Sequence, residues 1–312
     1  MKKILITGSD GYIGYCLYKF LMKKYKVFGL DKSNKNNKKN HKINLLNKKK
    51  LSNFFKFHKP DIVFHLAGYS TIDNINKKRA YIKNNIQATK NLIAEMKRNK
   101  IGKIVFSSTA AVYNARNRRK LLTEKSLLKP NNIYGSTKLN SEKIIKESKI
   151  KYVIFRFFNV CSSIPKLSVG ENHKPETHLI PLSIKKALQN KTLNIYGENY
   201  NTFDGTCIRD YVHIKDICDA SEKSISYLEN NKSITLNLGS AKGFSVKQII
   251  LEIKKKLKNS KSKIKTLRKR AGDVECLVCQ NNQARYKLNW SPKFSNLNKI
   301  IDDEVIWQKS SI

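Results

Sequence analysis

The stretch Lys3-Ile4-Leu5-Ile6-Thr7-Gly8-Ser9-Asp10-Gly11-Tyr12-Ile13-Gly14 decides the fold. Its first residues form an apolar run of the length of a buried strand, and the residues after the last glycine carry the spacing of an amphipathic helix. Glycines at positions 8, 11 and 14 allow a tight turn, close approach of the backbone to a ligand, and packing of helix on strand. The free N–H groups that begin such a helix attract negative charge.

The alternation of strand and helix continues through the first half of the chain. Apolar runs at 3–7, 26–30, 61–65, 103–107 and 152–157 predict buried strands, and residues 12–24, 48–57, 80–99 and 134–147 carry helical spacing. This order predicts a doubly wound parallel α/β sheet of the Rossmann type. The pattern loosens after residue 162, with helices near 179–189 and 246–257. We therefore expect one domain over residues 1–162 and a smaller mixed α/β domain over residues 163–312.

The basic excess needs an explanation, because 63 Lys and Arg residues against 23 Asp and Glu residues give a net charge of +40. Nucleic-acid-binding proteins show such an excess, but they concentrate it on one face and rely on arginine for reading bases. Here the charge is spread along the chain, including the lysine- and asparagine-rich residues 32–42, which we predict to be a solvated loop. Nucleic-acid binding by a degenerate scaffold remains a remote alternative. A positive field also attracts anionic substrates.

Cysteine usage and hydropathy bear on the compartment. No run approaches the ~20 apolar residues that a membrane span needs, and the apolar start is too short for a signal peptide. The six cysteines are scattered, which favours a reducing cytoplasm. Cys276 and Cys279 have the spacing of a metal or redox pair, but a zinc site needs a second pair of ligands that the sequence does not show. We expect a cytoplasmic protein without a metal.

An acidic residue, Asp31, directly follows the second predicted strand. A carboxylate in this position accepts hydrogen bonds from the adenosine ribose hydroxyls and repels a 2′-phosphate, which favours NAD over NADP. Lys32 and Lys35 follow closely and offer positive charge for such a phosphate, so NADP stays open.

Tyr134 and Lys138 are one helical turn apart and therefore lie on the same helix face. An ammonium about 5 Å from the phenol, at an effective dielectric near 20, favours the phenolate by roughly 3 kcal/mol, or ~2 pKa units. The pair predicts a general base that works near neutral pH. The bare pattern also arises by chance in many helices. Two further segments, Ser107-Ser108-Thr109 and Arg156-Phe157-Phe158-Asn159, end neighbouring predicted strands where ligands bind in this fold.

These segments resemble the extended short-chain dehydrogenase/reductase family, and the second half resembles the UDP-glucose 4-epimerases within that family. The later matches are residues 176–181 (Glu-Thr-His-Leu-Ile-Pro), 195–197 (Ile-Tyr-Gly), 204–213 (Asp-Gly-Thr-Cys-Ile-Arg-Asp-Tyr-Val-His) and 268–273 (Arg-Lys-Arg-Ala-Gly-Asp). The resemblance implies interconversion of UDP-glucose and UDP-galactose through a 4-keto intermediate, by transient hydride transfer to bound NAD. It also implies a homodimer formed through residues 80–99 and 134–147.

The same resemblance assigns roles to residues. The catalytic residues are Thr109, Tyr134 and Lys138. The NAD-binding residues are Gly8, Gly11, Tyr12, Ile13, Gly14, Asp31, Asn44, Leu45, Leu66, Ala67, Gly68, Asn85, Tyr134, Lys138 and Phe158. The substrate-binding residues are Thr109, Asn159, His178, Leu179, Asn194, Ile195, Tyr196, Arg209, Arg270 and Asp273.

Two positions discriminate among relatives. Related dehydratases place acidic residues directly after the catalytic Ser or Thr, whereas this chain has Ala110 and Ala111, which cannot transfer protons. Leu277 falls where the bulk of the side chain limits entry of N-acetylated sugars, and leucine is intermediate in size. Epimerisation of UDP-glucuronate or of a UDP-N-acetylhexosamine therefore stays open as the nearest alternative.

Overall fold

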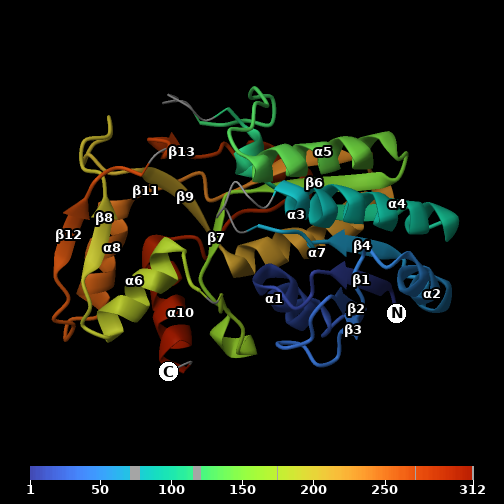
Figure 1. Cartoon of the computed structure of the whole chain (residues 1–312), viewed down its shortest axis with the longest axis horizontal. Helices are drawn as coiled ribbons and strands as arrows, with labels where there is room; N and C mark the ends of the chain where they lie inside the picture. Colours follow the sequence, from blue (N-terminus) through green and yellow to red (C-terminus); the bar gives the residue numbers. More distant parts are fainter. Residues whose placement is uncertain (71–77, 115–120, 174, 271, 311–312) are drawn as a thin grey trace.

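A seven-stranded parallel sheet forms the centre of the larger half of the molecule in the computed structural model (Figure 1). The structure describes residues 1–70, 78–114, 121–173, 175–270 and 272–310. In spatial order the strands are β10 (Ile234–Leu238), β6 (Lys151–Phe157), β5 (Lys103–Thr109), β4 (Ile62–His65), β1 (Lys3–Thr7), β2 (Lys26–Asp31) and β3 (His41–Lys42). All neighbours in this sheet pair in parallel.

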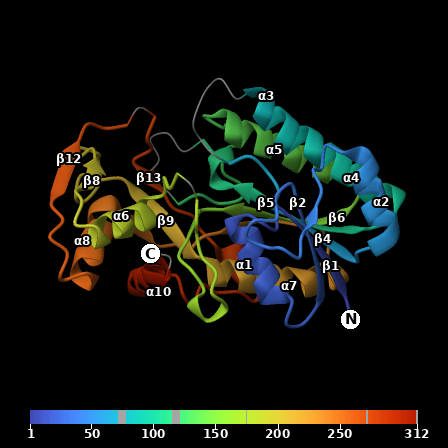
Figure 2. The same ribbon diagram turned by 60° about the horizontal axis from the view of Figure 1, so that its bottom comes forward.

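Side chains of β1 alternate between two hydrophobic cores, as the pleat of a strand requires. Ile4 and Ile6 pack with α1 (Tyr12–Leu21) and α7 (Ile214–Asn230), while Leu5 packs with helices on the other face. These helices are α2 (Lys48–His58), α4 (Ala88–Arg98) and α5 (Ile133–Glu147). Figure 2 shows the sheet between the two helix layers. The doubly wound fold is therefore confirmed.

The smaller half carries two short sheets. One has the order β11 (Gly243–Ser245), β9 (Ile208–His213) and β13 (Cys276–Leu277), with β7 (Asn159–Cys161) also paired to β9. The other joins β8 (Leu193–Tyr196) to β12 (Ile264–Leu267). Helices α6 (Leu179–Leu188), α8 (Val246–Lys256) and α10 (Leu297–Ser310) enclose a separate buried cluster. The chain also forms η4 (Pro165–Leu167) and α9 (Asn282–Leu288).

Two features of the larger half were not predicted. Residues 80–98 are helical as predicted but do not form one regular α-helix, because the chain forms α3 (Lys78–Tyr81), the π-helical turn η2 (Ile82–Gln87) and then α4. The chain also returns to the larger sheet after residue 162, since α7 packs on α1 and β10 pairs with β6. None of the helices in the described ranges is long and apolar enough to cross a bilayer.

Candidate active site

The glycine loop between β1 and α1 is held too closely for side chains at two positions. Gly8 has a φ of +75°, and a Cβ there would lie 2.6 Å from the Ala67 nitrogen. A Cβ on Gly14 would lie 2.0 Å from the Gly8 oxygen, so only glycine allows α1 to approach the strand. Gly11 is the exposed N-cap residue of α1, and no side chain makes a capping hydrogen bond there. The loop therefore presents a helix N-terminus that no side chain covers.

Residues 32–40 form a loop whose lysines are exposed, as predicted, but the loop also folds back onto the glycine loop. The Asp10 carboxylate accepts hydrogen bonds from the backbone nitrogens of Asn36 at 2.7 Å and Asn37 at 2.8 Å. Ser9 donates to Asn40 at 2.8 Å, and Asn37 and Asn40 are buried. The last residues of the predicted loop form β3.

Asp31 lies beside the loop at the end of β2, as predicted. One of its carboxylate oxygens accepts a hydrogen bond from the Asp10 nitrogen at 3.1 Å, and the other accepts from the Ser33 nitrogen at 3.1 Å. Burial raises the pKa of the Asp31 carboxyl. The Tyr12 side chain turns away from the loop to donate to the Ser162 oxygen at 2.6 Å, and Ile13 packs against the core.

The first turn of α5 brings Tyr134 to Thr109 at the carboxyl end of β5. Asn132 caps this helix by accepting from the Gly135 nitrogen at 2.7 Å. A Cβ on Gly135 would lie 2.2 Å from the Ala111 oxygen, so glycine is required for this approach. The Tyr134 and Thr109 side chains form a hydrogen bond. Two segments far apart in sequence therefore meet through a helix cap and a glycine.

Burial raises the pKa of Tyr134 to about 12, and the bond with Thr109 offsets only part of this effect. The prediction that Lys138 lowers the pKa of Tyr134 is therefore wrong for the protein without cofactor or substrate. The sequence argument assumed a solvated phenol next to a full ammonium charge. In the structure the phenol is desolvated, and burial also lowers the pKa of Lys138 to about 7.

Lys138 is 4% exposed and lies among residues that end two strands. Its Nζ lies 3.5 Å from the Ser107 hydroxyl and 4.4 Å from the centre of the Phe106 ring. A Cβ on Gly68, in the turn after β4, would lie 3.7 Å from the same nitrogen. Leu66 and Ala67 precede Gly68 in that turn and are half-buried.

Asn85 joins the same turn to α5 from within the π-helical turn η2. It is 2% exposed, accepts from the Tyr69 nitrogen at 2.7 Å and donates to the Thr137 hydroxyl at 2.9 Å. The structure therefore brings Gly68, Asn85, Lys138, Thr109 and Tyr134 to one edge of the sheet. π-Helical turns are frequent at functional sites.

A buried ion pair that sequence reasoning missed supports this edge. Arg156 on β6 contacts the Glu142 carboxylate through two nitrogens, at 3.0 and 2.8 Å, and the side chains are 2% and 0% exposed. Ser108 donates to the same carboxylate at 2.5 Å. Arg156 also donates to the Tyr113 hydroxyl at 2.9 Å, and Tyr113 donates to Asn237 on β10 at 2.6 Å. The spacing Tyr134, Lys138, Glu142 was the available signal, since all three lie on one helix face.

Apart from Thr109, which ends β5, the predicted substrate residues lie on the smaller half. Arg209 donates to the Val274 oxygen at 2.6 Å and lies 3.6 Å from Asp273. The Arg270 guanidinium lies 3.9 Å from the centre of the Tyr196 ring, and hydrogen bonds from Arg270 and from Asn194 lower the pKa of that phenol. His178 contacts carboxylates, as described below, directly before Leu179 begins α6. Ile195 is buried on β8, and Asn159 donates to the Asp210 oxygen at 3.2 Å. Ala271 lies outside the described residues.

Three predicted cofactor residues have local structural partners. Asn44 accepts from the Leu46 nitrogen at 3.0 Å, Leu45 is 5% exposed in the core under α2, and Phe158 packs with Ala110 and Tyr113. All six cysteines are free, and Cys279 contacts the Asp210 carboxylate at 3.2 Å.

Comparison with known proteins places this geometry in a family. The model of the NAD dependent epimerase/dehydratase family matches residues 4–239. The UDP-glucose 4-epimerase of Streptococcus mutans is 36% identical over 98% of this chain and 97% of its own length. The chain belongs to the NAD-dependent epimerase/dehydratase family.

Solved structures of the family superpose over the whole chain. The UDP-glucose 4-epimerase of Bifidobacterium longum in complex with NAD⁺ and UDP has a TM-score of 0.90 at 25% identity and covers 99% of this chain and 98% of its own. The UDP-Glc/GlcNAc 4-epimerase of Campylobacter jejuni has a TM-score of 0.85 at 31% identity, with 99% and 100% covered. Both halves of the molecule, and not only the larger sheet, therefore share the family fold.

The residues around the glycine loop fit the cofactor of the family. Gly11 leaves the N-terminus of α1 open to a pyrophosphate, where helix N–H groups bind anions. The Asp31 carboxylate lies next to that loop as an acceptor for ribose hydroxyls. Gly68 keeps the turn beside Lys138 free of a side chain. These are the features that NAD requires.

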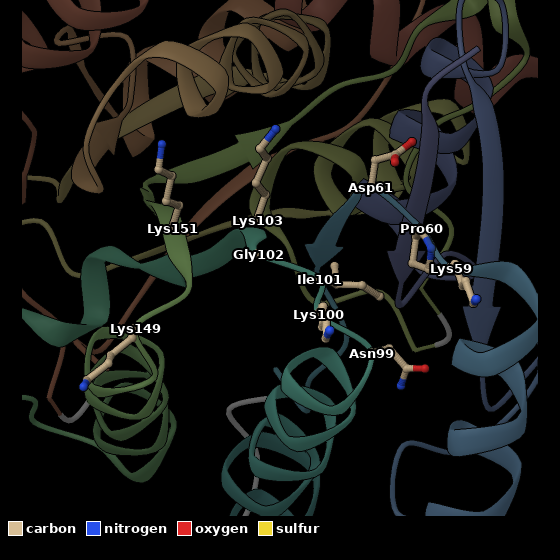
Figure 3. A pocket seen from close by; sticks show the side chains of 10 residues that line it. All are labelled: Lys59, Pro60, Asp61, Asn99, Lys100, Ile101, Gly102, Lys103, Lys149 and Lys151. Carbon is tan, nitrogen blue, oxygen red and sulfur yellow. The ribbon is translucent and has the colours of Figure 1, made fainter.

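The opposite edge of the sheet carries a hollow of about 540 Å³ (Figure 3). Lys59, Lys100, Lys103, Lys149 and Lys151 line it, and we call it the lysine hollow. Lys103 and Lys151 begin β5 and β6, and the other three follow α2, α4 and α5, so the hollow lies at the edge opposite the catalytic one. No proposed catalytic residue lines it.

Proposed function

We propose that this protein is a UDP-glucose 4-epimerase that interconverts UDP-glucose and UDP-galactose. The observation that carries the proposal is the cluster of Tyr134, Thr109 and Lys138 at the carboxyl edge of the sheet, beside a loop that fits NAD. Ala110 and Ala111 follow Thr109 in a short 3₁₀ turn and supply no further acid or base. This supports epimerisation over dehydration.

Proton transfer falls to Tyr134 in this proposal. As a phenolate, Tyr134 takes the proton from the carbon-4 hydroxyl of the sugar and later returns it, while Thr109 holds both oxygens in place. Bound NAD supplies the acceptor that takes the carbon-4 hydride and gives it back. Lys138, with a pKa of about 7, is partly protonated near neutral pH, and its positive charge then favours the phenolate form of Tyr134.

Anchoring the nucleotide falls to the smaller half. We propose that Arg209 and Arg270 pair with the diphosphate, because guanidinium groups bind phosphate oxygens through two parallel hydrogen bonds. Asp273, 3.6 Å from Arg209, is proposed to accept a ribose hydroxyl. A grip on UDP rather than on the hexose lets the 4-keto sugar turn over and present its other face.

Substrate range is the second candidate question. The Campylobacter jejuni relative is a UDP-Glc/GlcNAc 4-epimerase, so UDP-GlcNAc is a substrate to test here. Leu277 on β13 packs against the cluster that contains Phe158 and Tyr113, which holds the leucine in place. UDP-glucuronate is the other substrate to compare.

Three wider expectations belong to the same proposal. Six free cysteines fit a reducing cytoplasm. We propose a homodimer formed through α4 and α5, which light scattering tests directly. We also propose no specific nucleic-acid partner, because the basic residues are mostly lysines spread along the whole chain.

The deciding experiment incubates purified protein with UDP-galactose, without added cofactor, and follows UDP-glucose by NMR. We expect interconversion by the wild type and a fall of ~10³-fold in rate for Tyr134→Phe, the size typical of a lost general base. Retained NAD in both proteins serves as the control for folding. No conversion of UDP-galactose, with or without NAD, would overturn the assignment. Parallel reactions with UDP-GlcNAc and UDP-glucuronate would then identify the substrate.

A further inference from the structure

Four potential metal ligands converge in the segment that leads into α6. The side chains of Glu171, His173, Glu176 and His178 each offer one ligand atom, and these atoms all lie within 4.8 Å of one another. The Nδ1 of His178 lies 2.8 Å from Glu171 and 3.0 Å from Glu176. The Nδ1 of His173 lies 2.9 Å from the same Glu171 oxygen. Two imidazoles and two carboxylates therefore point their ligand atoms into one small region.

The two carboxylates are buried without enough partners. The Glu171 side chain is 2% exposed and that of Glu176 is 4% exposed. The second oxygen of each, Oε2, is buried and has no hydrogen-bond partner among the residues that the structure describes. An unpartnered buried carboxylate oxygen is costly, and burial of such charge calls for a cation.

A third carboxyl group lies in the electrostatic field of these two. Glu304 on α10 is fully buried, and within the described part of the chain its own Oε2 also lacks a hydrogen-bond partner. Burial, together with the negative charge of Glu171 and Glu176, raises the pKa of Glu304 to about 8. Glu304 is therefore largely protonated near neutral pH, as expected beside two buried carboxylates.

We propose that Glu171, His173, Glu176 and His178 bind one divalent transition-metal ion, and that Zn²⁺ is the ion best suited to them. Imidazole nitrogen and carboxylate oxygen are common zinc ligands, whereas Mg²⁺ and Ca²⁺ prefer oxygen alone. Zinc bonds of about 2.0–2.2 Å place tetrahedral ligand atoms roughly 3.4 Å apart, so a group spanning 4.8 Å needs only a small contraction. Binding releases the imidazole protons that now link the histidines to the carboxylates.

The ion would hold a segment that borders both ligand sites. The backbone carbonyl oxygen of Glu171 accepts a hydrogen bond from the indole nitrogen of Trp307 at 2.8 Å, which ties the segment to α10. His173 and Trp307 line a cavity of about 150 Å³ together with Gly11 and Tyr12 of the glycine loop. His178 is the residue before α6, so this site gives His178 to the metal rather than to the UDP-sugar. From the sequence we expected no metal, because only Cys276 and Cys279 were considered as a pair of metal ligands.

The test measures metal binding by the full chain and does not depend on epimerase activity. Protein stripped with a chelator is titrated with Zn²⁺ by calorimetry, and Co²⁺ is added separately to record its visible absorption bands. We expect one Zn²⁺ per chain and a higher melting temperature on binding. The affinity should fall at least ~100-fold in His178→Gln, since even residues that only support a ligand contribute 10–100-fold. Mg²⁺ in place of Zn²⁺ should give no response.

Matched variants keep the test decisive. His58→Gln removes a partly buried histidine from an aromatic cluster that involves Phe28 and should bind Zn²⁺ like the wild type. Glu176→Gln keeps the shape of the side chain and should weaken binding even if His178→Gln fails to fold. Fewer than one Zn²⁺ per two chains, or equal affinity in Glu176→Gln and the wild type, would show that these residues form only an ion-pair cluster. Retained NAD reports folding in each variant.

Discussion

The two edges of the seven-stranded sheet carry positive charge in opposite ways. At the carboxyl edge, Lys138 and Arg156 are 4% and 2% exposed, and each has named partners. At the amino edge, the lysine hollow is open, and its one carboxylate, Asp61, is bound to the backbone nitrogen of Lys3 at 2.7 Å. A buried charge has a fixed geometry and a shifted pKa, whereas an exposed charge is screened by salt. The net charge therefore says little about the site, and the few buried charges say much.

Breaking the buried pair should have the largest effect. Glu142→Gln leaves the Arg156 guanidinium buried beside a neutral amide, and removal of one partner of such a pair destabilises proteins by ~3–5 kcal/mol. Urea unfolding measures the loss. Lys256→Gln removes the half-exposed pair with Asp302, 2.8 Å apart, and should change stability by less than ~1 kcal/mol. Equal effects of the two variants would erase the distinction between the pairs.

The pH dependence of stability should reveal the buried lysine. The folded-state pKa of Lys138 is about 7, below its unfolded value of 10.5. Between these values the unfolded chain binds the proton and the folded chain does not, so stability rises with pH, by at most about 1.4 kcal/mol per unit. Protein freed of nucleotide is unfolded in urea at pH 7, 8 and 9. Lys138→Met should remove this rise, and subtraction of its curve cancels the titration of the buried thiols. Parallel curves for the two proteins would contradict the assigned pKa.

Substrate affinity should separate two neighbouring arginines. Arg270 stacks on Tyr196 at 3.9 Å, and we expect Arg270→Ala to raise KM for UDP-galactose ~10-fold, about 1.4 kcal/mol, with little change in kcat. Arg268→Ala removes a charge two residues away and is the matched control. A similar rise in both variants would indicate general attraction of the anionic substrate by the basic surface.

The lysine hollow should give the smallest effects. Lys100 and Lys149 have φ values of 56° and 63°, a region that glycine adopts without strain. We expect Lys100→Gly with Lys149→Gly to leave kcat/KM unchanged and the melting temperature equal or higher. Nonspecific DNA binding should lose ~0.9 from its slope of log affinity against log salt for each lysine that contacted a phosphate. A fall in epimerase activity would instead connect the two edges.

Local patterns were enough to predict the strands and the residues of the catalytic edge. The bounds of β1 match the predicted run, and Thr109, Tyr134 and Lys138 meet at the predicted edge. The fold class follows because alternating buried strands and amphipathic helices have few ways to pack. The spacing of apolar residues indicates which residues are buried, and the predicted strands and helices all contribute buried residues to the two cores of the sheet.

Features set by tertiary packing were not predictable in the same way. The π-helical turn at Asn85 inserts one residue per turn without changing the apolar pattern. The pKa of Tyr134 depends on how deeply α5 packs on Ala111, which spacing alone does not give. To predict that β10 pairs with β6, one must know which strands pair when several other elements lie between them in the sequence. The contact of Glu171 with His178 depends on the path of an irregular segment, which has no periodicity to detect.

The position of β10 has a consequence for synthesis of the chain. The Tyr113 hydroxyl, beside the catalytic edge, donates a hydrogen bond to the Asn237 side chain. The backbone nitrogen of Asn237 in turn donates to the Glu124 carboxylate. During synthesis, all residues up to the end of β9 leave the ribosome before Asn237 does. The seven-stranded sheet therefore stays incomplete while part of the smaller half has already been made. A nascent chain stalled at residue 162 should thus stay sensitive to protease around Tyr113. Protection should arrive only when the strand beyond α7 has left the exit tunnel, which makes folding of the two halves a joint event rather than a sequence of two.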